Sequence, residues 1–385
     1  MHRVYCDANA TTPLLPAVME AMRPYWMEHF GNASSIHLEG QHARKAVDAA
    51  RETLAQFFQC RDSEVVFNSG GTEAANTAIC GLVRAGDHLI TTSIEHSAVL
   101  RAAERMADRG AEVTFVAPLS NGLIDPEDIR RALKPNTRLI SVMLANNETG
   151  VLQPVEEIGK IAAEAHAFFH IDAVQGAGKI LFDVRQFGCH LCSISAHKIH
   201  GPKGVGAMYV RRGTPLEPLV VGGSHERRQR AGTENVAGIV GLGKAVELAM
   251  QSLEDGSLER ITALRDRLEA GIHEIAGTGV NGAGAPRTAN TTNIRFAQLE
   301  GEALIIALDL KGVAVSGGSA CHSGSTEPSH VLMAMGLDKN AARASLRFSL
   351  LRTATDADVD HVLKVVPRAV DHLRALAPEV AGTLG

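Results

Sequence analysis

The sequence lacks an apolar run long enough to cross a membrane. Charged residues or glycines interrupt its apolar stretches before the roughly 20 residues that a spanning helix needs. The first residues, Met1 to Asp7, also lack the apolar core and the small-residue cleavage site of a secretory signal. We therefore expect a cytoplasmic protein that does not bind membranes.

Cysteine is scarce, and positive charge is not in excess. Only six cysteines occur in 385 residues, far below the density of a disulfide scaffold, so we expect reduced thiols. Lysine and arginine number 38 against 43 acidic residues, a formal net charge of −5. A mildly acidic chain argues against nucleic-acid binding, which usually needs a basic surface. The one dense basic stretch, 225–230, has no interleaved aromatic residues.

Between about residues 40 and 255, short apolar segments rich in β-branched residues alternate with amphipathic stretches. Such segments are typical of strands that are buried on both faces. The alternation predicts an α/β fold: a doubly wound, mainly parallel seven-stranded sheet with helices on both faces. The predicted strands are 65–67, 88–92, 113–116, 139–143, 168–171, 191–194 and 205–210.

The pattern changes after about residue 254. A charged amphipathic helix is predicted near 257–276, followed by short strands near 292–296, 313–316 and 346–349 that alternate with helices near 301–310, 328–336 and 355–375. We expect a large domain over residues 14–254. A smaller α/β domain is expected over residues 1–13 and 255–385, which include Cys321.

Residues capable of chemistry follow several predicted strands, and the carboxyl ends of such strands are where doubly wound sheets bind ligands. Lys198 follows strand 191–194, where partial desolvation favours a Schiff base with an aldehyde. Asp172 follows strand 168–171 and could pair with a protonated pyridine nitrogen, or serve only as a helix N-cap. His96 could stack on a planar cofactor, or merely begin a helix.

Two glycine-containing loops are further candidates. Segment 68–73 opens a helix directly after a strand and suits a phosphate cradle, although such turns are common in α/β folds. Cys321 lies in the Gly/Ser-rich loop 315–325, a placement that suits a nucleophile, and the adjacent His322 favours its thiolate.

A zinc site is a competing interpretation of Cys189, Cys192, His197 and His200. However, the four residues between the two ligand pairs are too few for the usual loop. We also expect the strand at 191–194 to send Cys189 and Cys192 to opposite faces of the sheet. The sequence therefore predicts no metal.

Six ordered motifs occur along the chain, from Asp7 to Pro13, Ala145 to Gly150, Ser195 to Lys198, Arg230 to Asn235, Ser319 to Cys321 and Arg347 to Ser349. Together they resemble the pyridoxal-phosphate-dependent cysteine desulfurases of the NifS/IscS type. The resemblance implies fold type I of these enzymes, class V of the aminotransferase group, and a homodimer with its active site at the subunit boundary.

The resemblance also implies a role for each matching residue. Lys198 would hold pyridoxal 5′-phosphate and act as the base, Asp172 would pair with the pyridine nitrogen, and Gln175 would donate to the phenolic oxygen. His96 would stack on the ring, and Cys321 would be the nucleophile that accepts sulfur. The phosphate would be bound by Gly71, Thr72, Ser195, His197 and the neighbouring subunit's Thr233, and the substrate carboxylate by Asn147 and Arg347.

The implied reaction converts L-cysteine to L-alanine and leaves the sulfur on Cys321 as a persulfide. An iron–sulfur scaffold or another sulfur-acceptor protein would then take it. The alternative is a selenocysteine lyase or another fold type I enzyme such as an aminotransferase, in which Cys321 would be dispensable. A non-catalytic scaffold with this fold is disfavoured, because Lys198, Asp172 and Cys321 are all present.

Overall fold

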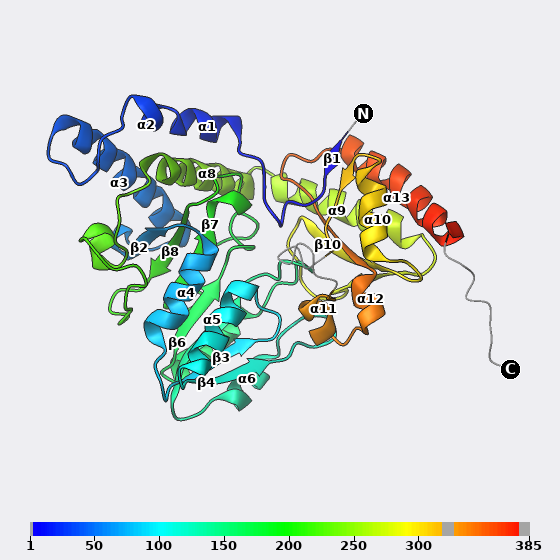
Figure 1. The fold of residues 1–385 in the computed structure, drawn as a ribbon, viewed down its shortest axis with the longest axis horizontal. Helices are drawn as coiled ribbons and strands as arrows, with labels where there is room; N and C mark the ends of the chain where they lie inside the picture. Colours follow the sequence, from blue (N-terminus) through cyan, green and yellow to red (C-terminus); the bar gives the residue numbers. More distant parts are fainter. Residues whose placement is uncertain (1–2, 318–326, 377–385) are drawn as a thin grey trace.

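The computed structural model describes residues 3–317 and 327–376, and its larger part is built on a seven-stranded sheet (Figure 1). The strand order is β2-β8-β7-β6-β5-β3-β4, and all neighbours are parallel except those of β8, which is antiparallel to β2 and β7. The predicted mainly parallel sheet is confirmed. Its strands are β2 (Val65–Asn68), β3 (His88–Thr92), β4 (Glu112–Val116), β5 (Thr137–Met143), β6 (Phe168–Asp172), β7 (Leu191–Ser195) and β8 (Gly206–Val210).

Helices cover both faces of this sheet, because side chains along each strand alternate between two cores. Leu89 packs with α4 (Gly71–Leu82) and α5 (Ser97–Asp108), in front of the sheet in Figure 1, whereas Ile90 belongs to the opposite core. That opposite core receives residues from the remaining helices of this part: α1 (Pro16–Met22), α3 (Leu38–Phe58), α6 (Pro126–Ala132), α7 (Val155–Glu164) and α8 (Val236–Glu254). The short α2 (Pro24–Met27) lies beside α1.

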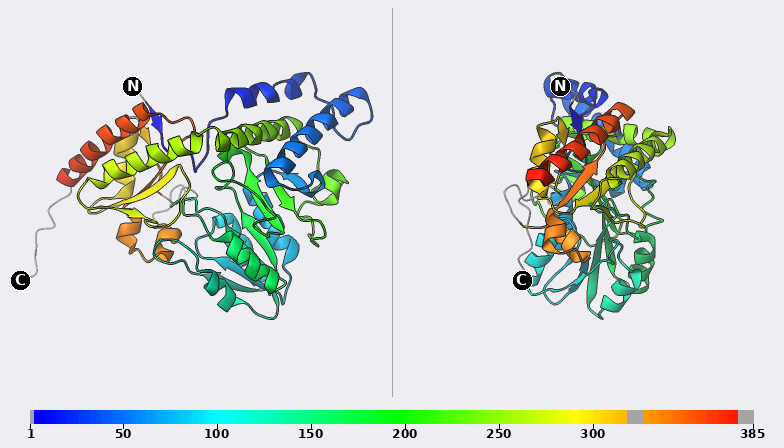
Figure 2. Two further views of the ribbon diagram at one scale, coloured as in Figure 1. Left: turned by 180° about the vertical axis from the view of Figure 1, so that it is seen from behind. Right: turned by 90° about the vertical axis from the view of Figure 1, so that its right-hand side faces the viewer.

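The smaller part is built around an antiparallel sheet with the order β12-β10-β9. The sequence did not predict β9 (Thr278–Asn281) or α12 (Lys339–Arg343), and the predicted helix at 328–336 is shorter. The other elements are β10 (Thr291–Phe296), β11 (Val313–Ala314), β12 (Ser345–Ser349), α9 (Ser257–His273), α10 (Gly301–Asp309), α11 (His330–Ala334) and α13 (Asp356–Leu376). Figure 2 shows α9 and α13 running side by side.

Each of the two cores contains residues from separate stretches of the sequence, so no single chain position separates the two parts. The small core contains Val4 and Cys6 together with side chains from Ile261 to Val370. Conversely, Val331 and Ala342, from α11 and α12, pack into the large core. We propose the boundaries at residues 13 and 254 as domain limits, with α11 and α12 as the elements that bridge them.

An extended N-terminal segment connects the two parts. Its strand β1 (Val4–Tyr5) pairs in parallel with β11 of the small part. A few residues later, the Thr12 N–H donates to the His197 carbonyl at 2.9 Å, and the His200 N–H donates to the Thr12 hydroxyl at 2.7 Å. The segment therefore lies directly across the loop that carries Lys198.

Among the described helices, α8 has the length and apolar composition of a membrane span. It packs against α3 and α1, and 56% of its apolar window is buried within the protein. This packing identifies α8 as a core helix of the large part.

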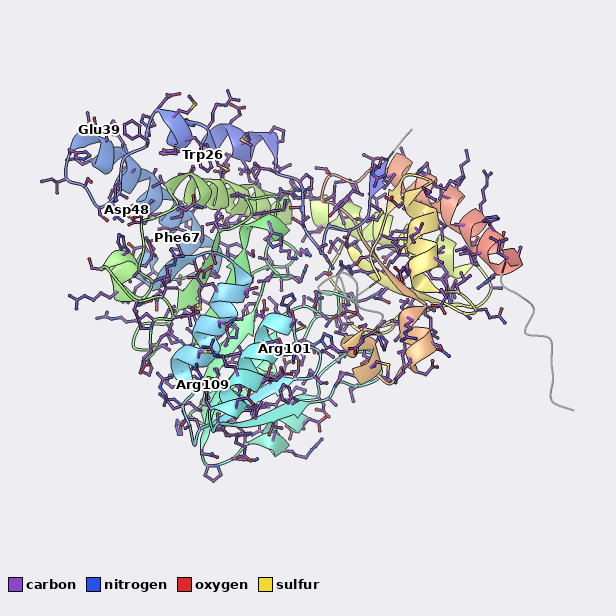
Figure 3. The ribbon with its side chains drawn as sticks, viewed as in Figure 1. Trp26, Glu39, Asp48, Phe67, Arg101 and Arg109 are labelled. Atoms are coloured by element: carbon purple, nitrogen blue, oxygen red, sulfur yellow. The ribbon has the colours of Figure 1, made fainter. Side chains whose placement is uncertain are left out.

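A buried ion pair lies against β2, one of the two edge strands of the large sheet. Arg51 and Glu226, 4% and 8% exposed, form two parallel hydrogen bonds of 2.8 Å. Arg51 also donates to the Val65 carbonyl, and Glu226 accepts from the Phe67 N–H at 3.0 Å, so the pair occupies polar groups of edge strand β2. The guanidinium lies 4.6 Å from the centre of the Phe67 ring, which Figure 3 labels.

The same pair anchors a strained turn. Glu226, Arg227 and Arg228 all have positive φ angles, of 46°, 56° and 69°. Each residue held in this way costs roughly 1 to 3 kcal/mol, so the turn requires support from the surrounding structure. The bonds of Glu226 to Arg51 and to β2 supply this support.

We expect Glu226→Ala to lower the free energy of unfolding by about 3 to 5 kcal/mol, because it leaves the Arg51 charge buried without its partner. Urea denaturation monitored by circular dichroism measures the change. The control is Glu104→Ala, which removes an exposed partner of Arg101 on α5 and should cost less than about 1 kcal/mol. Equal losses in the two variants would contradict the structural role of the buried pair.

Candidate active site

A cavity of about 320 Å³ lies at the carboxyl ends of the parallel strands, where the large part meets the N-terminal segment and β12. One predicted site residue, Thr233, is exposed on the surface and does not line it, and Cys321 lies outside the described residues. The cavity does bring together Gly71, Thr72, His96, Asn147, Asp172, Gln175, Ser195, His197, Lys198 and Arg347.

Lys198 ends the short 3-10 turn that follows β7. Its Nζ donates to the backbone carbonyls of Asn9 and Ala10, at 2.6 and 2.8 Å. These acceptors belong to the N-terminal segment, so the segment fixes where the amine lies in the cavity. The sequence placed Lys198 at the mouth of the sheet but gave no indication of these acceptors.

Asp172 ends β6, and its buried carboxylate accepts the Val174 N–H at 3.0 Å. Burial raises the pKa of Asp172, while the Val174 hydrogen bond and the positive charges of His96 and Lys198 oppose the rise. A buried carboxylate among cationic groups is suited to hold a further cation. The His96 ring lines the same cavity, and its Nδ1 accepts the Ala98 N–H at 3.1 Å. His96 is thus the N-cap of α5, as one interpretation from the sequence has it, and it also lines the cavity; its stacking on a cofactor stays a prediction.

The other end of the cavity lies at the N-terminus of α4. Gly70 is the N-cap residue of this helix and has a φ of 137°. Because glycine has no side chain, the N-cap residue does not occupy the first N–H groups of α4. A Cβ on Gly71 would fall 2.8 Å from the Val174 side chain. Together with the hydroxyls of Thr72 and Ser195, this arrangement can bind an anion.

Arg347 projects from β12 and is 1% exposed. Its Nη1 donates to the Asn147 carbonyl at 2.8 Å, and its Nη2 pairs with the Asp7 carboxylate at 2.6 Å. The Arg347 Nε and the Asn147 Oδ1 are buried, and neither has a hydrogen-bond partner among the described residues. Unsatisfied polar atoms beside a cavity indicate that a polar ligand completes the site.

Comparisons with known proteins agree with this geometry. A family model described as aminotransferase class-V matches residues 4–362. A cysteine desulfurase IscS of Methanosarcina thermophila is 47% identical over 379 residues, covering 97% of this chain and 94% of that protein. A cysteine desulfurase of a Nostoc species is 47% identical over 382 residues, covering 98% and 95%. This chain belongs to the cysteine desulfurases of the NifS/IscS type.

Solved structures agree with membership of the desulfurase family. A NifS-like protein superimposes with a TM-score of 0.89 at 36% identity, over 96% of this chain and all (100%) of that one. A structure titled SspA in complex with cysteine has a TM-score of 0.80 at 36% identity, and covers 90% of this chain and 98% of that chain. The fold is therefore that of the fold type I desulfurases.

Several cavity residues were not singled out from the sequence. Asn9 and Glu148 lie within motifs shared with the desulfurase family, so a signal for them was present, whereas His330 had none. The buried Glu148 carboxyl accepts a hydrogen bond from Ser329, which anchors the start of α11. Burial raises the pKa of Glu148, and the Ser329 hydrogen bond and nearby positive charges oppose this rise.

The expected separation of Cys189 and Cys192 is wrong. Cys189 lies between a turn and β7 rather than on the strand, its thiol donates to the Val184 carbonyl at 3.7 Å, and both cysteines belong to the same core. Burial and the neighbouring Cys189 raise the pKa of Cys192 well above its usual value. The described residues contain no cluster of three or more histidine, cysteine or acidic side chains arranged to hold a metal.

His197 is held neutral in this desulfurase fold. Its Nδ1 lies 3.1 Å from the Thr11 hydroxyl. Burial, followed by the positive charges of Lys198 and Lys203, lowers the pKa of His197 from 6.5 to about 4. At neutral pH, the imidazole therefore acts as a polar hydrogen-bonding group in the cavity rather than as a cation.

The lowered pKa predicts a pH effect on stability. Between pH 6.5 and about 4, the unfolded chain binds a proton at His197 that the folded protein does not, so stability falls as the pH is lowered through this window. We expect ligand-free His197→Gln to lose less stability than the wild type between pH 7.5 and 4.5. Urea denaturation at several pH values measures this difference. Parallel pH profiles for the two proteins would contradict the neutral state of His197.

Proposed function

We propose that the chain is a pyridoxal-phosphate-dependent cysteine desulfurase. It would convert L-cysteine to L-alanine and transfer the sulfur to the Cys321 thiol, which becomes a persulfide. The observation that carries the proposal is the meeting of Lys198, Asp172 and His96 in one cavity with the N-terminus of α4. The substrate is taken from the family to which the chain belongs.

The residues present fit pyridoxal phosphate. The N-terminus of α4 would hold the phosphate together with Thr72, Ser195 and His197, and a side chain on Gly71 would fill part of this cradle. Asp172 would pair with the pyridine nitrogen at the opposite end. The volume of about 320 Å³ lies within the usual range for a small-molecule site.

When bound, pyridoxal phosphate supplies an electron sink that stabilises negative charge at the substrate α-carbon. Asp172 would hold a proton at the pyridine nitrogen, because its buried carboxylate is stabilised by a cationic partner. Lys198 would be the base that takes the proton from the substrate α-carbon. Asn9 and Ala10 hold the Lys198 amine through their carbonyls and so restrict where it can act.

The substrate carboxylate would bind to Arg347 and Asn147. The guanidinium is buried, and its contacts with Asp7 and the Asn147 carbonyl fix its plane before a substrate arrives. A fixed guanidinium can form a bidentate pair with a carboxylate, which orients the substrate. The unpartnered Arg347 Nε supports this assignment.

We infer that the functional unit is a homodimer. Thr233 is exposed outside the cavity of its own chain, and it would bind the phosphate in the second copy. The neighbouring Arg230 pairs with Glu73, in the first turn of α4, at 2.9 Å.

We propose a cytoplasmic location and an iron–sulfur scaffold or other acceptor protein as the recipient of the sulfur. In this transfer a free thiolate of the acceptor attacks the outer sulfur of the persulfide, the S–S bond breaks, and Cys321 leaves as its thiolate, so the acceptor thiol must be reduced. The five cysteines outside the undescribed segment are all free. Burial raises the pKa of Cys6 and of Cys60 to about 12, so these thiols are poor nucleophiles.

We expect Cys321→Ser to lower alanine formation from L-cysteine by about 100-fold or more, because the nucleophile that accepts the sulfur is lost. The visible absorbance of the bound cofactor should remain, since Lys198 is unchanged. Cys60→Ser is the matched control and should keep full activity. Normal turnover by Cys321→Ser would overturn the persulfide mechanism and favour another fold type I activity.

A further inference from the structure

Lys179 is a half-buried lysine to which the sequence assigned no role. It lies between the two parts of the protein, beside a small cavity of about 50 Å³ that Lys198 also lines. Its Nζ donates to the side-chain oxygens of two amides, Gln175 Oε1 at 2.8 Å and Asn9 Oδ1 at 3.0 Å. Lys179 does not line the larger cavity of about 320 Å³, but Gln175 and Asn9 do, so Lys179 can affect that cavity through their amides.

The contacts of Gln175 fix which end of its amide carries the oxygen. Its Oε1 faces the Lys179 amine, and its Nε2 donates to the Asn9 carbonyl at 2.9 Å. The flipped amide would place two donors together at Lys179 and two acceptors together at Asn9. Because Nε2 carries two hydrogens and Asn9 takes one, the second remains for a ligand in the cavity that Gln175 lines.

Lys179 also contributes to the orientation of the Asn9 amide. The Asn9 Oδ1 accepts from Lys179 at 3.0 Å and from the Asn290 amide at 3.3 Å, and the Asn9 Nδ2 donates to the Asn147 carbonyl at 3.1 Å. That carbonyl also accepts from Arg347 at 2.8 Å. The Lys179 amine thus contacts two amides, one that lines the cavity beside Asp172 and one that contacts the Asn147 carbonyl.

We propose that Lys179 is a positioning residue that locks the amides of Gln175 and Asn9, so that Gln175 presents an N–H to the phenolic oxygen of bound pyridoxal phosphate. This inference rests on the proposed function. Lys179 itself does not touch the cofactor.

The charge state of Lys179 does not alter this role. Desolvation, followed by the positive charges of Lys198 and Arg347, lowers the pKa of Lys179 to about 7. The ammonium can only donate and therefore selects the Gln175 Oε1, and when the amine is neutral the Asn9 carbonyl, which can only accept, still keeps the Gln175 Nε2 on its own side.

The test is a double-mutant cycle of Lys179→Met and Gln175→Ala. The two readouts are the visible absorbance spectrum of the cofactor-loaded protein and the dissociation constant of pyridoxal phosphate from the apoprotein. Losing one well-oriented hydrogen bond should weaken cofactor binding about tenfold and shift the absorbance band. In the Gln175→Ala background, Lys179→Met should change binding by less than about twofold, because the amide that Lys179 orients is gone.

Two further variants complete the experiment. Lys160→Met removes an exposed lysine from α7 and should leave both readouts unchanged. Should Lys179→Met not fold, Lys179→Gln replaces the amine with a neutral amide that can itself flip, and the same results are expected. Circular dichroism verifies the folding of each variant.

An unchanged spectrum and affinity in Lys179→Met would overturn the inference. An undiminished effect in the Gln175→Ala background would also overturn it, because Lys179 would then act by another route. Both results leave the proposed function standing if the wild type binds pyridoxal phosphate. A wild type that takes up no pyridoxal phosphate would overturn the proposed function and the inference together.

Discussion

The backbone carbonyls of Asn9 and Ala10 hold the amine of Lys198, and the geometry of the cavity depends on this contact. The N-terminal segment that supplies the two carbonyls is fixed at both ends. Strand β1 pairs with β11 of the small part, and Thr12 bonds to the loop of the large part that carries Lys198. A shift of either part would therefore move the acceptors relative to the amine, so the packing of the two cores sets the position of the reactive group.

The cavity and its surroundings bring titratable groups together in a buried space. Burial raises the pKa of Asp172 and Glu148, which line the cavity, while desolvation lowers the pKa of the adjacent Lys179 to about 7. Such opposed shifts are typical of sites that handle protons near neutral pH. The distribution is also asymmetric: the N-terminus of α4 and the Arg347 guanidinium are suited to anions, and the Asp172 carboxylate is suited to a cation.

The large sheet and most of the cavity were predictable from the sequence for the same physical reason. A strand buried on both faces is continuously apolar, so the sequence shows where the strand ends. The residues that follow parallel strands then lie at one edge of the sheet. Asp172 and Lys198 could be found in this way. Gln175 and Arg347 required the resemblance to the desulfurase family, because neither residue type is distinctive alone.

What remained unpredicted depends on contacts between distant or irregular segments. Arg51 and Glu226 are 175 positions apart, and neither belongs to a pattern that would pair them. Cys189 and Cys192 enter the same core because Cys189 precedes β7, where strand alternation does not apply. Lys179 in a glycine-containing turn is indistinguishable by sequence from a surface lysine, and its function follows only from the two amides that it contacts.

The most direct test of this account is to identify the lysine that binds the cofactor. Reduction of the cofactor-loaded protein with borohydride, followed by proteolysis and mass spectrometry, locates the pyridoxyl group. The account predicts that the group is on the peptide that contains Lys198, with Lys179 and Lys203 unmodified. A pyridoxyl group on Lys179 or Lys203, or none on any peptide, would contradict it.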